Sequence, residues 1–171
     1  MDRNELLEPF ERMLETISSP AHVRAVEQGA SAVPLWDELV QSGFLDALAP
    51  ESAGGAGLTL ADVEPLWQAL GRHAVPVPVA ETMAARFLLA EAGVDAPQGP
   101  IAFATVRLGQ DVVVPFGLVA EHVLVDLGDG MVLAAVASGQ PEPTGVAGSL
   151  AARMRWDRVP DGPKLPAPED G

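Results

Sequence analysis

The chain has 171 residues, of which 48% are hydrophobic and 20% are charged, so it holds enough apolar material for a buried core. The absence of cysteine excludes disulfides, thiolate metal sites and cysteine nucleophiles, and the three histidines lie too far apart in sequence to suggest a metal site. A net charge of −14 argues against nucleic-acid binding, because phosphate contacts require clustered Lys and Arg. The N-terminus lacks the pattern of a secretory signal, and no run is long enough to span a bilayer. We therefore expect a soluble, cytoplasmic protein.

Hydrophobic spacing in the first half of the chain predicts five amphipathic helices. They are expected at residues 4–18, 20–28, 34–43, 60–70 and 80–92. Ser19 and Pro20 are typical of a helix start, with serine as the N-cap and proline at the first helical position. Thr59 and Asp62 form a pair similar to a capping box, with Asp in place of the usual Glu or Gln.

Two prolines and a short proline-rich segment modify this pattern. Pro9 lies near the start of the first helix, and Pro65 is expected to kink the fourth helix or to shift its start. Residues 76–78 (PVP) predict an extended spacer. In the fifth helix, the inward-facing residues are expected to be Met83, Phe87 and Ala90.

A glycine-rich segment separates the third and fourth predicted helices. Residues 50–57 (PESAGGAG) contain three glycines, whose backbone entropy disfavours a helix. Glycine-rich loops can cradle phosphates when a strand precedes and a helix follows. Here a helix precedes, and no Lys or Arg is near, so a tight helix-to-helix turn is the favoured interpretation. Glu51 is interpreted as a solvated acid, and Arg72 with His73 as cations that favour a helix C-terminus rather than as an anion site.

Beyond residue 94 the pattern changes from helices to strands. Short aliphatic runs with turn residues between them predict strands at residues 101–106, 112–114, 123–126 and 131–136. Residues 127–130 (LGDG) predict a hairpin turn. Arg153 and Arg155 alternate with Met154 and Trp156, as on a strand with one solvent-exposed face.

The pattern as a whole predicts an α+β chain. We expect an N-terminal all-α helical bundle at residues 1–94 and a small, reduced antiparallel β-barrel or sheet domain at residues 95–160. Residues 161–171 are proline-rich and predict a linker or tail. The acids near the strand ends have no metal-ligand spacing, and no serine lies in a nucleophile elbow. The residues alone therefore indicate no self-sufficient active site and no metal site.

An ordered set of short motifs resembles the acyl-CoA dehydrogenase family. The motifs are residues 35–45 (LWDELVQSGFL), 49–51 (APE), 54–58 (GGAGL), 69–72 (ALGR), 75–78 (VPVP) and 80–82 (AET). They are similar in order and spacing to the family's P-E-x-x-G-G-x-G loop and to its later LGR…P.P..ET sequence. The combination is specific, although each piece alone is weak.

The resemblance continues into the second half with departures. Residues 104–111 (ATVRLGQD) fall where the family has T-E-P-x-x-G-S-D, but the Glu-Pro is absent and Gln110 replaces the serine. Residues 115–121 (PFGLVAE) and 155–160 (RWDRVP) resemble later β-domain segments of the family. The longer β-excursion between these points, which includes W-x-x-N-G-x-K, is missing.

The resemblance implies a flavin oxidoreductase that acts on an acyl-CoA thioester and uses FAD. Complete members of the family have a third, C-terminal helical domain and form oligomers. A glutamate, usually in that domain, removes the α-proton while a hydride passes from the β-carbon to flavin N5. The domain lies outside these 171 residues, so we predict no catalytic residue in this chain. By the resemblance, Thr105, Pro115, Phe116 and Gly117 match positions that approach the flavin and are the predicted cofactor-binding residues, while the alternative for Thr105 is a plain strand residue.

Three functions follow as hypotheses. The first is an acyl-CoA dehydrogenase-like oxidoreductase, present here as a truncated chain or as one piece of a split or heteromeric enzyme and inactive by itself. The second is a non-catalytic partner subunit that kept the fold and lost FAD, burying an apolar helical face against an active homologue. The third is an unrelated helical binding module with a β-tail. The first predicts an acyl-CoA substrate and a homo- or hetero-oligomer with acyl-CoA dehydrogenase-like chains.

Overall fold

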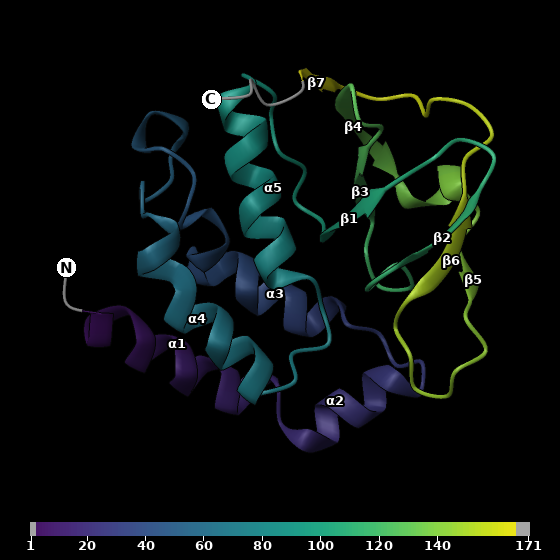
Figure 1. Cartoon of the computed structure of the whole chain (residues 1–171). Coiled ribbons are helices and arrows are strands. Elements are labelled where there is room, and N and C mark those ends of the chain that lie inside the picture. The colour runs from purple at the N-terminus through teal and green to yellow at the C-terminus, as the bar shows by residue number, and fades with distance from the viewer. Residues whose placement is uncertain (1–2, 167–171) are drawn as a thin grey trace.

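A computed structural model describes residues 3–166, with helices on one side of the molecule and two small sheets on the other (Figure 1). The α+β class expected from the sequence is confirmed. The α-helices are α1 (Arg3–Ile17), α2 (Pro20–Glu27), α3 (Val33–Ser42), α4 (Leu60–Arg72) and α5 (Val79–Glu91). Three short 3₁₀ helices are η1 (Phe44–Asp46), η2 (Glu51–Ala53) and η3 (Val136–Gly139).

The helix ends follow the local signals in the sequence. The Ser19 hydroxyl accepts a hydrogen bond from the backbone N–H of His22 and caps α2. Thr59 and Asp62 form both bonds of a capping box at the start of α4. Gly43 ends α3 in the left-handed conformation, with φ of 76°, which glycine adopts without a side-chain penalty.

Helix α4 runs from Leu60 to Arg72 with Pro65 inside it, so its start is not shifted, and the kink expected at Pro65 stays a prediction. Two details differ from the sequence-based expectations. Part of the segment 50–57 forms the 3₁₀ turn η2. Residues 76–78 are not an extended spacer, because the N–H of Val79 donates to the carbonyl of Val77 at 2.9 Å across Pro78. With φ of −78° and ψ of 68°, Pro78 is the centre of a tight three-residue turn.

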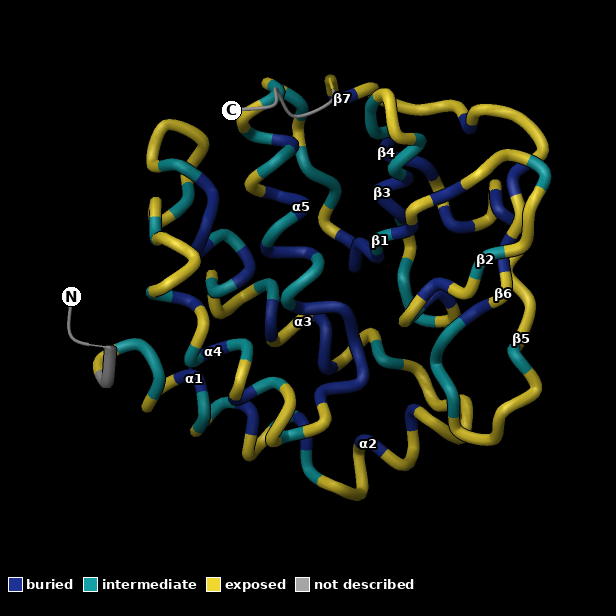
Figure 2. The backbone as a smooth tube through the Cα atoms, in the orientation of Figure 1, coloured by how far each residue is buried: buried dark blue, intermediate teal, exposed yellow. Residues whose placement is uncertain are grey.

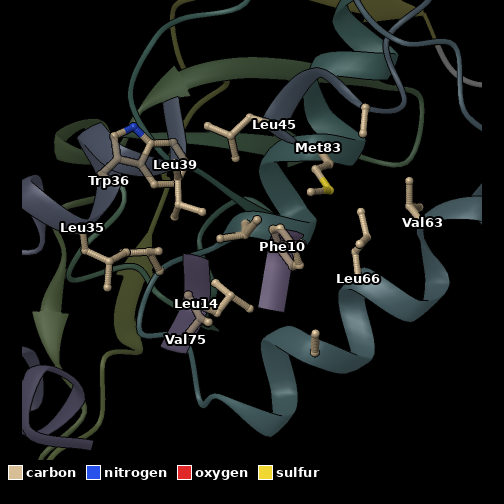
Figure 3. Close-up of a cluster of buried hydrophobic side chains, with 14 of the residues drawn as sticks. Phe10, Leu14, Leu35, Trp36, Leu39, Leu45, Val63, Leu66, Val75 and Met83 are labelled. Carbon is tan, nitrogen blue, oxygen red and sulfur yellow. The ribbon is translucent and has the colours of Figure 1, made fainter. Parts of the chain in front are cut away.

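The helices enclose one apolar core (Figure 3). It is built from α1, α3, α4, the segment that follows α3 and the start of α5. Phe10 of α1 meets Phe44 of η1 edge-on, with ring centroids 4.7 Å apart. The labelled side chains of this core are Phe10, Leu14, Leu35, Trp36, Leu39, Leu45, Val63, Leu66, Val75 and Met83.

Helix α5 lies between this core and the sheets, and its buried stripe differs from the predicted one. Met83 is fully buried as expected, but Phe87 is 39% exposed and Ala90 is half-buried. The buried stripe instead runs through Thr82, Ala85, Arg86 and Leu89, at the spacing of one helix face. The prediction of Phe87 and Ala90 as inward-facing was wrong because the buried face includes Thr82 and Arg86, and a search for apolar spacing passes over polar residues.

The strands form two open sheets rather than a closed barrel. Sheet A has the order β1-β3-β4-β7 and sheet B the order β2-β6-β5. The strands are β1 (Ile101–Thr105), β2 (Asp111–Val114), β3 (His122–Asp126), β4 (Gly130–Ala135), β5 (Glu142–Pro143), β6 (Ala152–Arg155) and β7 (Lys164–Pro166). The predicted hairpin at residues 127–130 joins β3 to β4, and β6 has the predicted alternation of buried and exposed residues.

One strand pairing departs from the expected antiparallel arrangement. Strands β1 and β3 are parallel, with Ile101 opposite His122 and Thr105 opposite Asp126. The chain leaves sheet A after β1, forms β2 in sheet B, and returns to the same end of β1 before β3 begins. A crossover of this kind makes the two neighbouring strands parallel.

Part of the segment predicted as a linker or tail belongs to sheet A. Strand β7 pairs antiparallel with β4, with Leu165 opposite Met131, and the Leu165 side chain is buried. Sequence periodicity could not reveal a three-residue strand between prolines. Residues 167–171 of the predicted tail lie outside the described residues, and the division of the chain near residue 94 stays a prediction.

A second apolar cluster joins α5 to sheet A. Ala85 and Leu89 of α5 pack with Ile101, Leu124 and Leu133 of the sheet, and Leu165 of β7 completes the cluster. A third cluster lies between the two sheets and includes Met154 and Trp156. In the burial-coloured trace, buried residues alternate with less buried ones along α5, and β3 and β4 contain continuous buried runs (Figure 2). Helix α5 is therefore shared between the helical and the β parts of the molecule.

Polar contacts reinforce this junction. The Thr82 hydroxyl donates to the carbonyl of Pro78 at 2.6 Å and accepts from the N–H of Ile101 at 2.9 Å, which fixes the start of β1 on α5. Arg86, whose side chain is 6% exposed, donates from Nη1 to both carboxylate oxygens of Asp46 at 2.8 and 2.9 Å. The indole N–H of Trp36 donates to the carbonyl of Gln98 at 2.9 Å. These bonds join the helices to the chain that enters the sheet.

We predict that Thr82→Val destabilises the protein by about 2 kcal/mol, because the buried N–H of Ile101 loses its acceptor. Thr82→Ser keeps the hydroxyl and is the matched control. Thr82→Ser should therefore keep most of the stability that Thr82→Val loses, as measured by chemical denaturation of the full chain. Equal destabilisation by the two substitutions would show that the methyl group, and not the hydrogen bond, is important.

Candidate functional site

A cleft lies where the helices meet the β part. It has a volume of about 520 Å³ and is formed by the C-terminal half of α4, the first turn of α5, the turn after β2 and the loop before β6. Gly148 lies on the β side of the cleft, and a Cβ on this residue would lie 3.9 Å from Glu27 of α2. The cleft volume is within the range of small-molecule sites.

The walls of the cleft are mainly apolar. Trp67 and Leu70 come from α4, Val77 and Val79 from the turn that leads into α5, and Leu150 from the loop before β6. The indole N–H of Trp67 is directed at the sulfur of Met83, 3.3 Å away, which fixes the ring at the edge of the helical core. This lining can hold an apolar ligand and exclude water from it.

Two wall residues have a backbone conformation that side chains rarely adopt. Ala74 has φ of 47° and Phe116 has φ of 59°, and both line the cleft. A left-handed conformation is costly for a bulky residue such as phenylalanine and is found most often at functional sites. Gly117 follows Phe116, and a Cβ on it would come within 2.7 Å of the Ala152 Cβ. Close packing against β6 therefore holds this turn in place.

Glu81, in the first turn of α5, is the half-buried acid of the cleft. Burial away from water raises the pKa of its carboxyl above the ordinary value of 4.5, and the hydrogen bond with its own backbone N–H lowers it by less. The other charged residue on the wall is Glu27, which is exposed. Among the described residues, no Lys or Arg lines the cleft.

The four predicted cofactor-binding residues are not brought together. Pro115 and Phe116 line the cleft, and Gly117 is buried directly behind them. The N–H of Glu121 donates to the carbonyl of Pro100, so this turn lies near the start of β1, whereas Thr105 is exposed at the far end of that strand. The backbone N–H of Gly117 already donates to the carbonyl of Val114 at 3.1 Å.

The cleft does not fit a complete FAD. A dinucleotide diphosphate needs cationic side chains or free backbone N–H groups, and here the charged wall residues are Glu27 and Glu81. With Thr105 distant from the turn, the described residues do not form a flavin site by themselves. Glu81, Trp67 and Ala74 were not identified as site residues from the sequence. The AET motif at residues 80–82 included Glu81 but gave no sign of its burial.

Other candidate residues have structural roles. In the glycine-rich segment the N–H groups of Gly55, Ala56 and Gly57 donate to backbone carbonyls of residues 46–50, so they are not free to hold a phosphate. A Cβ on Gly55 would come within 2.0 Å of the carbonyl oxygen of Ala49, which explains glycine at this turn. The helix-to-helix turn interpretation is thus supported. Within residues 3–166, no group of three or more His, Asp or Glu is arranged for a metal ion, and no helix is long and apolar enough to cross a membrane.

Comparison with solved structures finds similar chains for nearly the whole length. A variant of Tcur3481-Tcur3483, described as a steroid ACAD, has a TM-score of 0.74 and 26% identity over 96% of this chain and 57% of its own. The ChsE4-ChsE5 complex from Mycobacterium tuberculosis has a TM-score of 0.61 and 16% identity over 99% of this chain and 57% of its own. TdsC from a Paenibacillus species, solved with FMN and indole, has a TM-score of 0.53 and 13% identity, and the match covers 96% of this chain and 54% of TdsC.

The chain therefore spans a little over half the length of the solved chains that it matches. Of the three, only the first exceeds a quarter identity, and the other two show likeness of fold alone. No family model matches the sequence, and no curated protein matches it.

We predict that Gly117→Ala destabilises the protein by about 1–3 kcal/mol, because the new methyl group overlaps Ala152 and the carbonyl of Val114. Gly71→Ala is the control on the opposite wall of the cleft. It lies in α4, and a Cβ there meets nothing within 4 Å. It should be neutral or stabilising by up to about 1 kcal/mol, since alanine favours the helix. Thermal denaturation of both variants tests the tight packing of the turn.

We also predict that Glu81 lowers stability as the pH rises. Because the folded-state pKa of Glu81 is raised, the folded chain binds more protons than the unfolded chain at pH values between 4.5 and the raised pKa. The free energy of unfolding therefore falls as the pH rises through this range. Glu81→Gln removes the effect, and its melting temperature relative to the wild type should increase as the pH is raised above 4.5. Glu91→Gln, at the exposed end of the same helix, controls for the loss of one negative charge. A Glu81→Gln difference that is constant with pH would contradict the burial argument.

Proposed function

We propose that this chain, which has an acyl-CoA dehydrogenase-like fold over most of its length, takes part in the α,β-dehydrogenation of an acyl-CoA thioester as one piece of a split or heteromeric flavin enzyme. The observation that carries the proposal is the match to a steroid ACAD over 96% of this chain at 26% identity. It agrees with the ordered motifs between residues 35 and 82.

The cleft between α4, α5 and the turn after β2 is the proposed site for the acyl group. Its walls are mainly apolar, as binding of a large hydrocarbon body requires. The steroid substrate class named for the matched ACAD suggests a polycyclic acyl group. In this assignment Trp67, Leu150 and Phe116 hold the body of the substrate and exclude water from it.

Flavin and catalytic base are proposed to come from outside these 171 residues. FAD would accept the hydride, but the described residues do not form a site for it. Of the four residues predicted to bind the cofactor, we propose that only Pro115 and Phe116 contact a bound ligand, because they line the cleft. The first two matched structures, Tcur3481-Tcur3483 and ChsE4-ChsE5, each have two named components, which supports an assembly with acyl-CoA dehydrogenase-like chains.

A second candidate function is a non-catalytic partner subunit. The cleft has two acids and, among the described residues, no cation on its walls, and the segment at residues 104–111 lacks the Glu-Pro of the family signature. A subunit of this kind would stabilise or regulate an active homologue without binding flavin. It differs from the first candidate in whether its cleft receives the substrate.

The test is flavin retention and activity with and without a partner. The purified chain is incubated with FAD, passed through gel filtration and examined by visible absorption, alone and after co-expression with acyl-CoA dehydrogenase-like chains. We expect no retained flavin for the chain alone. A flavin-containing complex should oxidise a steroid acyl-CoA and lose at least about tenfold in kcat/KM when Phe116 is changed to Asp, which places a charge in the apolar cleft. Unchanged kinetics in the Phe116→Asp complex would favour the partner-subunit function.

A further inference from the structure

The carboxylate of Glu81 faces the cleft with free capacity to accept hydrogen bonds. It lies on the apolar cleft and is half-buried. Within residues 3–166, its hydrogen-bond partner is its own backbone N–H and no other residue. A carboxylate can accept several hydrogen bonds, so a ligand in the cleft can supply a further donor to this half-buried group.

The neighbouring polar residues of the same helix have side-chain bonds to other parts of the fold, which distinguishes Glu81 from them. Thr82 bonds to Pro78 and Ile101, and Arg86 bonds to Asp46. Their side chains are directed into the junction, whereas Glu81 faces the cleft. Thr82 and Arg86 thus stabilise the fold, whereas the carboxylate of Glu81 is available to bond to a ligand.

The surroundings of Glu81 determine what can meet it. Glu27 is the other charged wall residue, and no cation on the described walls would attract a phosphate or a carboxylate. An anionic end of a ligand is therefore disfavoured beside Glu81. A neutral hydroxyl suits the position, because it can donate to the carboxylate while the attached hydrocarbon contacts Trp67, Val79 and Leu150.

We propose that Glu81 is a specificity-determining residue that accepts a hydrogen bond from a hydroxyl group on the apolar body of the ligand. The cleft thereby selects hydroxylated polycyclic acyl groups over fully apolar ones. This inference rests on the proposed function, since it takes the cleft as the acyl site. Glu81 has no part in the bond-breaking steps, and its role is to orient the distal end of the substrate.

The test uses two steroid acids that differ by one hydroxyl, lithocholate and cholanate, at concentrations below aggregation. Binding to the full chain is followed by the fluorescence of Trp67, which lies on the cleft wall, and Trp67→Phe identifies its signal. The wild type should bind lithocholate about tenfold more tightly than cholanate, the worth of one hydrogen bond to a charged group. Glu81→Leu should abolish this preference, whereas Glu81→Gln, which keeps an acceptor oxygen of the same shape, should retain part of it.

Glu91→Gln is the matched control for charge on the same helix and should leave the preference unchanged. Equal binding of the two acids by the wild type, an unaltered preference in Glu81→Leu, or no binding of either acid would overturn the inference. Failure of the proposed enzymatic function has a different signature. In that case steroid acids would still bind with the Glu81-dependent preference, while complexes with partner chains would show no flavin and no oxidation of acyl-CoA.

Discussion

Helix α5 joins the two halves of the molecule through side chains on one of its faces. Ala85 and Leu89 pack against sheet A, Thr82 fixes the first residue of β1, and Arg86 is paired with Asp46 of the helical part. A buried arginine is tolerated only when its charge is compensated, so the position of η1 follows from that of α5. The relative placement of helices and sheets, and every feature between them, depends on this one face.

The cleft is a direct result of that arrangement. Its helical wall ends at the tight turn around Pro78, which starts α5, and its β wall is the turn at Pro115 and Phe116. Both walls contain a residue forced into the left-handed region, namely Ala74 and Phe116. The backbone strain is maintained because the flanking segments are anchored on either side, by α4 and by the packing of Gly117 on β6. The site is thus built from connections between elements and not from the elements themselves.

Local signals in the sequence were sufficient for most of the helices and strands, because caps and turns act over a few residues. Ser19, Thr59 and Gly43 were assigned correctly for this reason. The parallel pairing of β1 with β3 and the presence of β7 depend on contacts between distant segments, which periodicity does not contain. At the site, the resemblance led to Pro115 and Phe116, but the burial of Glu81 and the distance of Thr105 from the turn follow only from the three-dimensional arrangement.

The position of β7 as the most C-terminal of the described strands has a consequence for synthesis on the ribosome. The helical core ends with Met83 of α5 and is therefore synthesised first, but Leu165 of β7 closes the cluster formed by Leu89, Ile101 and Leu133. Until residue 166 has left the exit tunnel, the outer edge of β4 has no neighbour and this cluster has no cover. Nascent chains therefore expose an unpaired strand edge and apolar side chains until β7 has emerged.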